Sequence, residues 1–265
     1  MEHLSNLFFE LSHVDRLGIL NILKEEPMKL TNISEKMDCS TQEAYRHLSR
    51  LLDSGLASKT PGGDYIITSF GRQLMRLVPG FSFLNDNRKY FNSRDLSVIP
   101  EEFLLRIGEL NSSILVDDVM VTLFDVEVMV KEAEEYIYII IDQMIMNLYE
   151  PLIDATDRGT VFKEIRPRGW KLPDDIAARI DEKILKKAFE KVRKGEVIQR
   201  ELEKVPVVLA FSEKSVACLS FLDVDGEMDY LGFKSDDIKA HKWCRELFEY
   251  YWERAEKAKI RTKIL

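Results

Sequence analysis

The chain has 265 residues, 45% hydrophobic and 32% charged, which is typical of a folded protein with one large domain or two ordinary ones. Its longest apolar runs, such as YIYIII at 136–141, are far shorter than the roughly 20 residues that cross a bilayer. The first residues lack the basic start and cleavage site of a signal peptide. We therefore expect a cytoplasmic protein that has no membrane partner.

Charge is distributed unevenly along the chain. The net charge of −8 argues against a chain coated with nucleic acid. Residues 40–76, however, contain 5 Lys and Arg against 3 Asp and Glu, a local net charge of +2. Any contact with a polyanion is therefore expected in this window.

The three cysteines, Cys39, Cys218 and Cys244, are too few and too widely spaced for a disulfide framework or a Cys-x-x-Cys zinc site. We expect free thiols, and the sequence predicts no metal and no cofactor.

Two short helices are expected first. One begins after Ser12, which can cap it, and ends before Pro27. The other covers LTNISEKM at 30–37 with Thr31 as its cap, and DCS follows as a turn. Their inward apolar residues are Leu17, Leu20, Ile22, Leu23, Ile33 and Met37.

A third helix is predicted within STQEAYRHLSRLLDSGL, residues 40–56. Ser40 and Glu43 form a capping box at its start, and Gly55 followed by Leu56 is typical of a left-handed helix end. The apolar stripe at helical spacing is Ala44, Leu48, Leu51 and Leu52. The opposite face carries the hydrogen-bond donors Thr41, Gln42, Tyr45, Arg46, Ser49 and Arg50.

A small hairpin and another helix complete this part of the chain. LASKT and YIITS are expected strands joined by the turn sequence PGGD at 61–64. The helix FGRQLMRLV at 70–78 is expected to place Phe70, Leu74 and Leu77 on one side and to end at Pro79. We therefore expect a domain over residues 1–78 and a linker over 79–98.

A solvated surface would explain the polar face of a lone helix, but its neighbours favour another interpretation. Helix, turn, capped helix and glycine-tipped hairpin in this order are typical of a winged helix-turn-helix, whose second helix enters the major groove of DNA. There Gln42 could pair with adenine, and Arg46 or Arg50 with guanine. Lys59, Arg72 and Arg76 could bind phosphates. The predicted DNA-binding residues are Ser40, Thr41, Gln42, Tyr45, Arg46, Ser49, Arg50, Lys59 and Arg72.

The segment MKLTNISEKMDCSTQEAYRHLSRLLDSGLASKT, with RHL in mid-helix and the ending DSGL, resembles the winged helix of the ArsR superfamily of prokaryotic transcription regulators. The resemblance covers roughly residues 12–77. Metal-sensing members carry a Cys-x-Cys pair in this helix, whereas this chain has only Cys39 just before it, so sensing by that route is not expected. We interpret His47 as a partly buried helix residue rather than a ligand, because no second ligand lies at a metal-binding spacing.

The rest of the chain, residues 99–265, predicts an α/β domain. Apolar strands are expected at 136–141, 160–165, 205–211, 216–222 and 228–233. Helices are expected at 100–110, 121–135, 148–159, 174–194 and 236–258. Strands that are apolar throughout and alternate with helices indicate a sheet buried on both faces.

Four segments of the second half, NDNRKYFNSRDLSVIPEEFLLRIGEL, EEYIYIIIDQ, DRGTVFKEIRP and WCRELFEYYWERA, are similar to the C-terminal domain of archaeal winged-helix regulators first associated with methanogenesis control. The similarity spans about residues 85–258. It implies an archaeal source and an effector-binding or assembly domain. More distantly, the domain resembles the phospholipase D-like fold that TrmB-type archaeal regulators use to bind sugars.

No enzyme is expected. Phospholipase D chemistry needs His-x-Lys-x4-Asp, and the lysine after His241 stands at the wrong spacing. The Gly-x-Ser-x-Gly elbow, the Walker loop and the His-Glu-x-x-His helix are also absent from the sequence.

Binding of a small anionic or polar effector is the expectation for this domain, because ligands of open α/β sheets lie at the carboxyl ends of the strands. Converging arginines there would suit a carboxylate or phosphate. The alternative is that these are ordinary loop residues, with Asp223 and Asp225 in a turn before Gly226. The candidate effector residues are Asp142, Gln143, Arg166, Arg168 and Ser212.

Together these features predict a homodimeric transcription regulator that binds double-stranded DNA. The apolar N-terminal residues Leu4, Leu7, Phe8 and Leu11 could supply the helix packing of a dimer. Two alternatives stay open: a protein-interaction adaptor that uses the winged helix without specific DNA binding, and an enzyme on the C-terminal domain.

Overall fold

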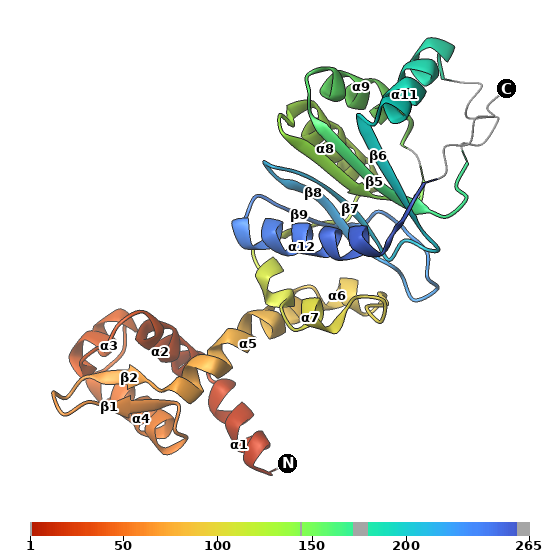
Figure 1. Ribbon diagram of the computed structural model, residues 1–265. Coiled ribbons are helices and arrows are strands. Elements are labelled where there is room, and N and C mark those ends of the chain that lie inside the picture. The colour runs from red at the N-terminus through yellow and green to blue at the C-terminus, as the bar shows by residue number, and fades with distance from the viewer. Residues whose placement is uncertain (1, 144, 172–179, 259–265) are drawn as a thin grey trace. The chain divides into compact units, whose positions relative to one another are not determined.

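The computed structural model describes residues 2–143, 145–171 and 180–258. The chain divides into two compact units, Met1–Phe81 and Ser82–Leu265 (Figure 1). Within the described ranges, none of the helices combines the length and the apolarity that a bilayer crossing requires.

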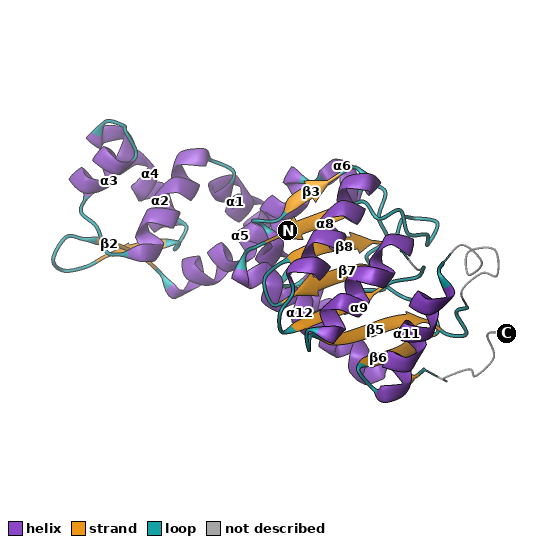
Figure 2. Cartoon of the chain, turned by 90° about the horizontal axis from the view of Figure 1, so that it is seen from above, coloured by secondary structure: helices purple, strands orange, loops and turns teal. Residues whose placement is uncertain are grey.

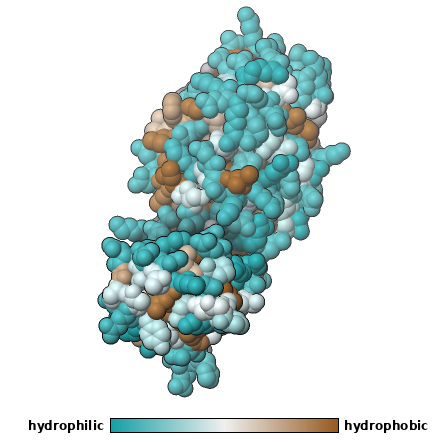
Figure 3. Space-filling view, turned by 90° about the vertical axis from the view of Figure 1, so that its left-hand side faces the viewer, coloured by the Kyte–Doolittle hydropathy of each residue, from teal (hydrophilic) through white to brown (hydrophobic). Residues whose placement is uncertain are grey.

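The N-terminal unit is helical with a two-stranded hairpin. Its side chains enclose one apolar core, built from every element between residues 19 and 75. Figure 3 shows one side of this unit, where small hydrophobic patches lie among hydrophilic residues. The elements are α1 (Glu2–Leu11), α2 (Val14–Glu25), α3 (Leu30–Lys36), α4 (Thr41–Asp53), β1 (Ala57–Lys59), β2 (Tyr65–Ile67) and the first part of α5 (Ser69–Asp86).

Helix α4 has the ends that its sequence predicts. The Ser40 side chain accepts the Glu43 amide, and the Glu43 carboxylate accepts the Ser40 amide, so the capping box is complete. At the other end Gly55 adopts a φ of 72°, and the Leu56 amide donates to the Leu51 carbonyl at 2.9 Å. The face toward the core is buried at Ala44, Leu48 and Leu51, and Leu52 packs beside it.

The caps of the two preceding helices differ from the prediction. His13, not Ser12, caps α2, because its Nδ1 accepts the Asp15 amide at 3.2 Å. The Ser12 hydroxyl instead donates to the Phe9 carbonyl and closes α1. Lys29 precedes α3 without a side-chain cap, so the prediction of Thr31 as cap is also wrong.

Helix α5 does not end at Pro79 but continues through it to Asp86. Proline removes only one helical hydrogen bond, the one to residue 75, and packing on both sides keeps the helix intact. Met75 is buried in the core and Leu74 packs beside it, whereas Phe70 and Leu77 are each 50% exposed, so the predicted apolar face is confirmed only for Leu74. Phe83 and Tyr90 are buried in the core of the second unit, so residues 79–98 are not a linker.

The second unit contains a large sheet with helices on both faces. The first residues of the helix expected at 174–194 lie outside the described residues. The elements are α6 (Arg88–Phe91), α7 (Glu101–Leu104), η1 (Ile107–Leu110), β3 (Ile114–Val116), α8 (Val119–Glu132), β4 (Tyr136–Ile140), η2 (Met146–Leu148), α9 (Tyr149–Asp157), β5 (Val161–Pro167), α11 (Glu182–Lys194), β6 (Val197–Leu202), β7 (Val207–Ser212), β8 (Val216–Phe221), β9 (Gly232–Ser235), α12 (Ile238–Arg254) and β10 (Glu256–Lys257).

The strand order is β10-β6-β5-β4-β7-β8-β9-β3. Strands β4, β5 and β6 run parallel, and β7 pairs with β4 in the antiparallel direction, so the sheet is mixed. Helices α8 and α9 cover one face and α12 covers the other (Figures 1 and 2). Along β4, Ile137 and Ile139 point into the apolar core between the sheet and helices α8 and α9. Ile140 points into the core between the sheet and α12. This domain of mixed sheet and helices confirms the predicted fold class.

Candidate nucleic-acid interface

The outward face of α4 presents polar and charged side chains. Thr41, Gln42 and Arg46 are exposed, and Tyr45 is 56% exposed. Because the opposite face is fully buried and the first turn is capped, these side chains have a fixed position on the surface of the unit. Among the residues that the structure describes, Arg46 has no ion-pair or hydrogen-bond partner.

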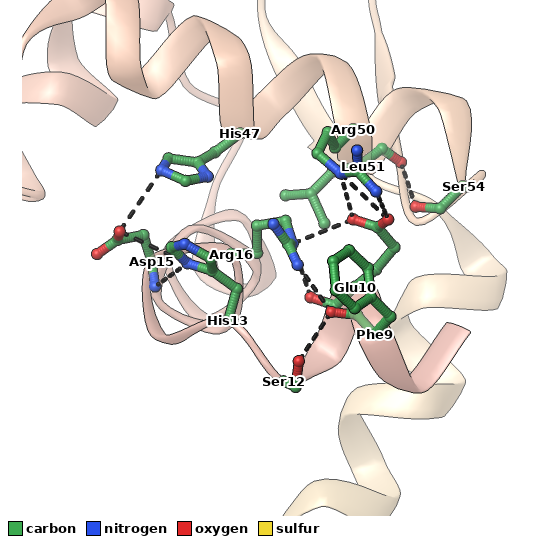
Figure 4. Close-up of polar contacts among 10 residues, drawn as sticks. All are labelled: Phe9, Glu10, Ser12, His13, Asp15, Arg16, His47, Arg50, Leu51 and Ser54. Atoms are coloured by element: carbon green, nitrogen blue, oxygen red, sulfur yellow. Dashed lines mark hydrogen bonds and ion pairs between the residues drawn. The ribbon is translucent and has the colours of Figure 1, made fainter. Parts of the chain in front are cut away.

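Arg50 was predicted to lie on the same face, and the structure gives it a different role. Its Nε donates to Glu10 Oε2 at 3.0 Å, and its Nη2 donates to Glu10 Oε1 (Figure 4). The guanidinium also lies 5.4 Å from the centre of the Phe9 ring. Arg50 therefore binds α1 to α4, and Glu10 uses its Nε donor and one of its Nη2 donors.

Glu10 is a buried acid at the end of α1, with 7% of its surface exposed. Arg16 of α2 contacts the same carboxylate at 3.1 Å and donates to the Phe9 and Glu10 carbonyls. The hydrogen bond from Arg50 is the main cause that lowers the pKa of Glu10, although burial opposes it. One carboxylate thus connects three helices of the unit.

Other predicted DNA-binding residues of α4 also have internal partners. The Ser40 hydroxyl is occupied by the capping box, where it donates to Glu43 at 3.0 Å. These bonds from Ser40 lower the pKa of Glu43 and hold the negative charge of this face at the helix start. The Ser49 hydroxyl donates to the Tyr45 carbonyl at 2.9 Å.

The basic residues of the hairpin and α5 are exposed. Lys59 lies over the Tyr65 ring at 5.2 Å. Arg72 donates to the Lys24 carbonyl at 3.0 Å. Arg76 donates to the Gln73 side chain at 3.2 Å. These single bonds leave further donors on both arginines.

A second polar cluster lies where the start of α2 meets α4 (Figure 4). His47 Nε2 and His13 Nδ1 are each 3.5 Å from the same carboxylate oxygen of Asp15. The centres of the two imidazole rings are 4.5 Å apart. Burial is the main cause that lowers the pKa of His47, which is 6% exposed. Spacing along α4 could not reveal this cluster, because its partners come from residues 13–15.

The predicted effector residues do not form one group. Ser212 ends β7, which runs opposite to β4, so Ser212 pairs with Ile137 at the beginning of β4. Asp142 and Gln143 follow the other end of β4. The expectation that Ser212 lies at the same strand ends as Asp142 assumed that β4 and β7 are parallel. Because they are antiparallel, this expectation is wrong for Ser212.

The two arginines after β5 already have carboxylate partners. Arg166 lies 3.6 Å from Glu201 and faces the Trp170 ring. Arg168 contacts Glu256 at 2.9 Å and Glu203 at 3.7 Å. Carboxylates of the chain itself are thus the charged partners of both arginines.

Asp142 contributes to a cleft of about 920 Å³ in the second unit. The Asp142 carboxylate accepts a hydrogen bond from the Tyr230 hydroxyl at 2.5 Å. Sequence reasoning missed the other walls, because they come from five segments distant in the chain. Representative lining residues are Ile99, Leu104, Leu202, Pro206, Met228 and Tyr251.

The alternative that Asp223 and Asp225 lie in a turn is confirmed by the structure. Asp223 accepts the amides of Asp225 and Glu227, both at 2.9 Å, and Gly226 has a φ of 81°, so this segment is a turn. The aromatic residues of α12 pack on the sheet, with Trp243 and Phe248 fully buried.

The family model that matches the chain covers part of its first unit. Residues 13–59 match the family model described as bacterial regulatory protein, arsR family. No curated protein sequence matches the chain.

Among the solved structures that are similar to the chain are the following two. One is TrmBL2, an archaeal chromatin protein described as showing a novel mode of DNA binding, with 18% identity, 88% coverage of each chain and a TM-score of 0.43. The other is Nuc, a phospholipase D family member from Salmonella typhimurium, with 12% identity, coverage of 51% of this chain and 88% of that chain, and a TM-score of 0.36. Such distant likenesses assign no function. On the family match and its own geometry, the N-terminal unit is a winged helix-turn-helix of the ArsR type, the fold of a DNA-binding regulator.

Proposed function

We propose that this protein is a sequence-specific DNA-binding transcription regulator whose helix α4 lies in the major groove. The observation that carries the proposal is the unpaired, exposed Arg46 beside Gln42 and Tyr45 on a helix with a buried opposite face. An arginine on such a helix can donate two hydrogen bonds to the edge of guanine, and Gln42 can pair with adenine.

The local charge supports this placement. Residues 40–76 carry a net charge of +2 in a chain of net −8. The one acid near the start of this face, Glu43, accepts hydrogen bonds from the amide and the hydroxyl of Ser40. Lys59 on the hairpin and Arg72 and Arg76 on α5 would bind phosphates beside the groove.

The regulator would act as a homodimer, because one small module contacts too few base pairs to be selective. In α1, Leu4 is 47% and Phe8 is 50% exposed, and the Phe8 ring contacts Phe81 edge to face. Leu7 and Leu11 pack against the core of their own unit, which leaves Leu4 and Phe8 for a second copy. Half-sites would then lie about 10 base pairs apart, or a multiple of that.

The second unit would sense a small effector in the cleft that contains Asp142. Besides its apolar walls, this cleft has the acids Asp142, Glu101, Glu203 and Glu227 against the bases Lys204 and Arg254. The excess of carboxylates favours a largely apolar ligand with a hydrogen-bond donor or a positive charge. Of the anionic or polar effector expected from the sequence, we therefore propose the polar kind.

Genomic DNA fragments captured by the full-length protein would test the proposal. We expect a recurrent short sequence, bound with an affinity that falls as salt rises. The Arg46→Ala variant should lose the preference for this sequence over random DNA. Capture of no fragments, or binding that salt does not change, would contradict the proposal and favour the protein-interaction adaptor.

A further inference from the structure

We propose that His13, Asp15 and His47 form a binding site for a divalent transition-metal ion such as Zn²⁺. The three side chains lie where the first turn of α2 meets the middle of α4, and they point toward one another (Figure 4). Their possible ligand atoms all lie within 4.8 Å of one another. The site is separate from the outward face of α4 and does not depend on DNA binding.

The distances match a tetrahedral ion. Zinc lies about 2.0–2.2 Å from imidazole nitrogen and carboxylate oxygen, so two ligand atoms of a tetrahedron are about 3.4 Å apart. Asp15 Oδ2 is 3.5 Å from His47 Nε2 and 3.5 Å from His13 Nδ1. Two edges of the tetrahedron are therefore already present, and only the two histidines need to approach each other.

Ligation through Nε2 would give the buried His47 ring a bonded partner, which it now lacks in the described part of the chain. His47 is 6% exposed, and among the described residues its imidazole makes no hydrogen bond. Its Nε2, the atom that would bind the ion, faces only the Asp15 oxygen at 3.5 Å. The neutral imidazole is the form of histidine that binds metals.

The surroundings permit entry of an ion. The side chains of His13 and Asp15 are 41% and 49% exposed, so a hydrated ion can approach and a water molecule can be the fourth ligand. Arg16, the basic residue next to Asp15, is bound by Glu10 and by backbone carbonyls. Nδ1 of His13 accepts the Asp15 amide only at 3.2 Å, so the ion would replace a long hydrogen bond.

This site differs in kind from a thiolate sensor, because it uses imidazole and carboxylate. Imidazole with one carboxylate suits Zn²⁺, Co²⁺ and Ni²⁺, whereas Mg²⁺ and Ca²⁺ prefer all-oxygen sites. The ion would join the cap of α2 to α4, where Arg46 directly precedes the ligand His47.

Titration of tag-free full-length protein with Co²⁺, followed by the visible absorption of the bound ion, tests the site directly. We expect one ion per chain, displaced by Zn²⁺. His13→Ser removes a ligand but keeps an N-cap, since serine is a preferred capping residue. Asp15→Asn removes the charge at constant size. Each variant should weaken binding by at least about tenfold, with the far-ultraviolet circular dichroism unchanged.

The other two histidines provide matched controls. His3→Gln and His241→Gln should bind Co²⁺ like the wild type, because neither residue belongs to the cluster. Zn²⁺ should also raise the thermal unfolding midpoint of the wild type and of both controls, but not that of His13→Ser. No stoichiometric binding by the wild type, or equal binding by His13→Ser and the wild type, would refute the site.

Discussion

Glu10 of α1 binds Arg50 of α4 through both carboxylate oxygens, although 40 residues separate them in the chain. The pair is completed by Arg16 on the same carboxylate. An arginine that looks like a DNA contact in sequence is therefore a structural residue, and Arg46, one turn earlier, is the free guanidinium of this helix face among the described residues.

The two arginines should respond differently to substitution. Arg46→Ala should weaken binding to the preferred sequence by about 1–3 kcal/mol and leave the thermal midpoint unchanged. Arg50→Ala should lower the thermal midpoint, because Glu10 loses its main partner, and should retain the preference among sequences. Titrations at fixed salt on preferred and random DNA, with thermal unfolding of each variant, measure both effects. Equal loss of selectivity in both variants at unchanged stability would contradict this assignment.

The Glu10 cluster should make stability depend on acid pH. The pKa of Glu10 is lowered in the folded state, so its contribution is complete above the unfolded value near 4.5 and is lost as the pH falls through the lower folded value. The wild type should therefore be more stable than Glu10→Gln at neutral pH, and the difference should shrink below about pH 4.5. Urea unfolding at a series of pH values measures it. Glu2→Gln, at the exposed start of α1, serves as the control and should behave like the wild type.

Gly71 is required by close packing at the start of α5. A Cβ at this position would lie 2.3 Å from the Leu56 carbonyl oxygen. We expect Gly71→Ala to lower the free energy of unfolding by about 1–3 kcal/mol, since backbone must shift to admit the methyl group. Gly62→Ala in the hairpin turn meets nothing closer than 3.5 Å and should change stability by less than about 0.5 kcal/mol. Similar effects of the two changes in urea unfolding would show that this contact is not tight.

The proposed dimer can be tested at α1. Phe8→Glu places a charge on the exposed apolar surface and should convert a dimer to a monomer, as measured by light scattering during size-exclusion chromatography. Ile238→Glu, in an 80% exposed position of the second unit, is the matched control and should leave the mass unchanged. A wild-type monomer at micromolar concentration, or an unchanged mass for Phe8→Glu, would contradict a dimer through this surface.

The cleft of the second unit can be tested with a panel of metabolites and thermal unfolding. A ligand that raises the thermal midpoint of the wild type should have little effect on Leu104→Trp, which fills the cleft. Ser212 lies at the opposite ends of the strands from Asp142, so the Ser212→Ala variant should respond like the wild type. If Ser212→Ala alone lost the response, the effector site would lie outside the cleft.

The N-terminal unit could be predicted in detail because its signals are local. The Ser40 and Glu43 box, the apolar stripe from Ala44 to Leu51 and the PGGD turn each depend on residues a few positions apart. The errors have the opposite cause. The binding of Arg50 by Glu10, the approach of His13 to His47 and the continuation of α5 through Pro79 all depend on packing between distant segments.

In the second unit the strands were predictable and the pairing was not. Apolar runs identified β4, β7 and β8, because strands buried on both faces are continuously apolar. The short or polar strands β3, β6 and β10 lack that signal. Strand direction is set by connections and neighbours, so the sequence could not reveal that β7 opposes β4 and that Ser212 lies away from Asp142.

This antiparallel pairing has a practical consequence for reporter design. The turn between β7 and β8 lies at the strand ends that are opposite to Asp142. Glu213 in this turn accepts the amides of Glu134 and Tyr136 and must be kept. A fluorescent group attached at Lys214, whose side chain is 44% exposed, would thus report on the folding of the sheet without entering the cleft.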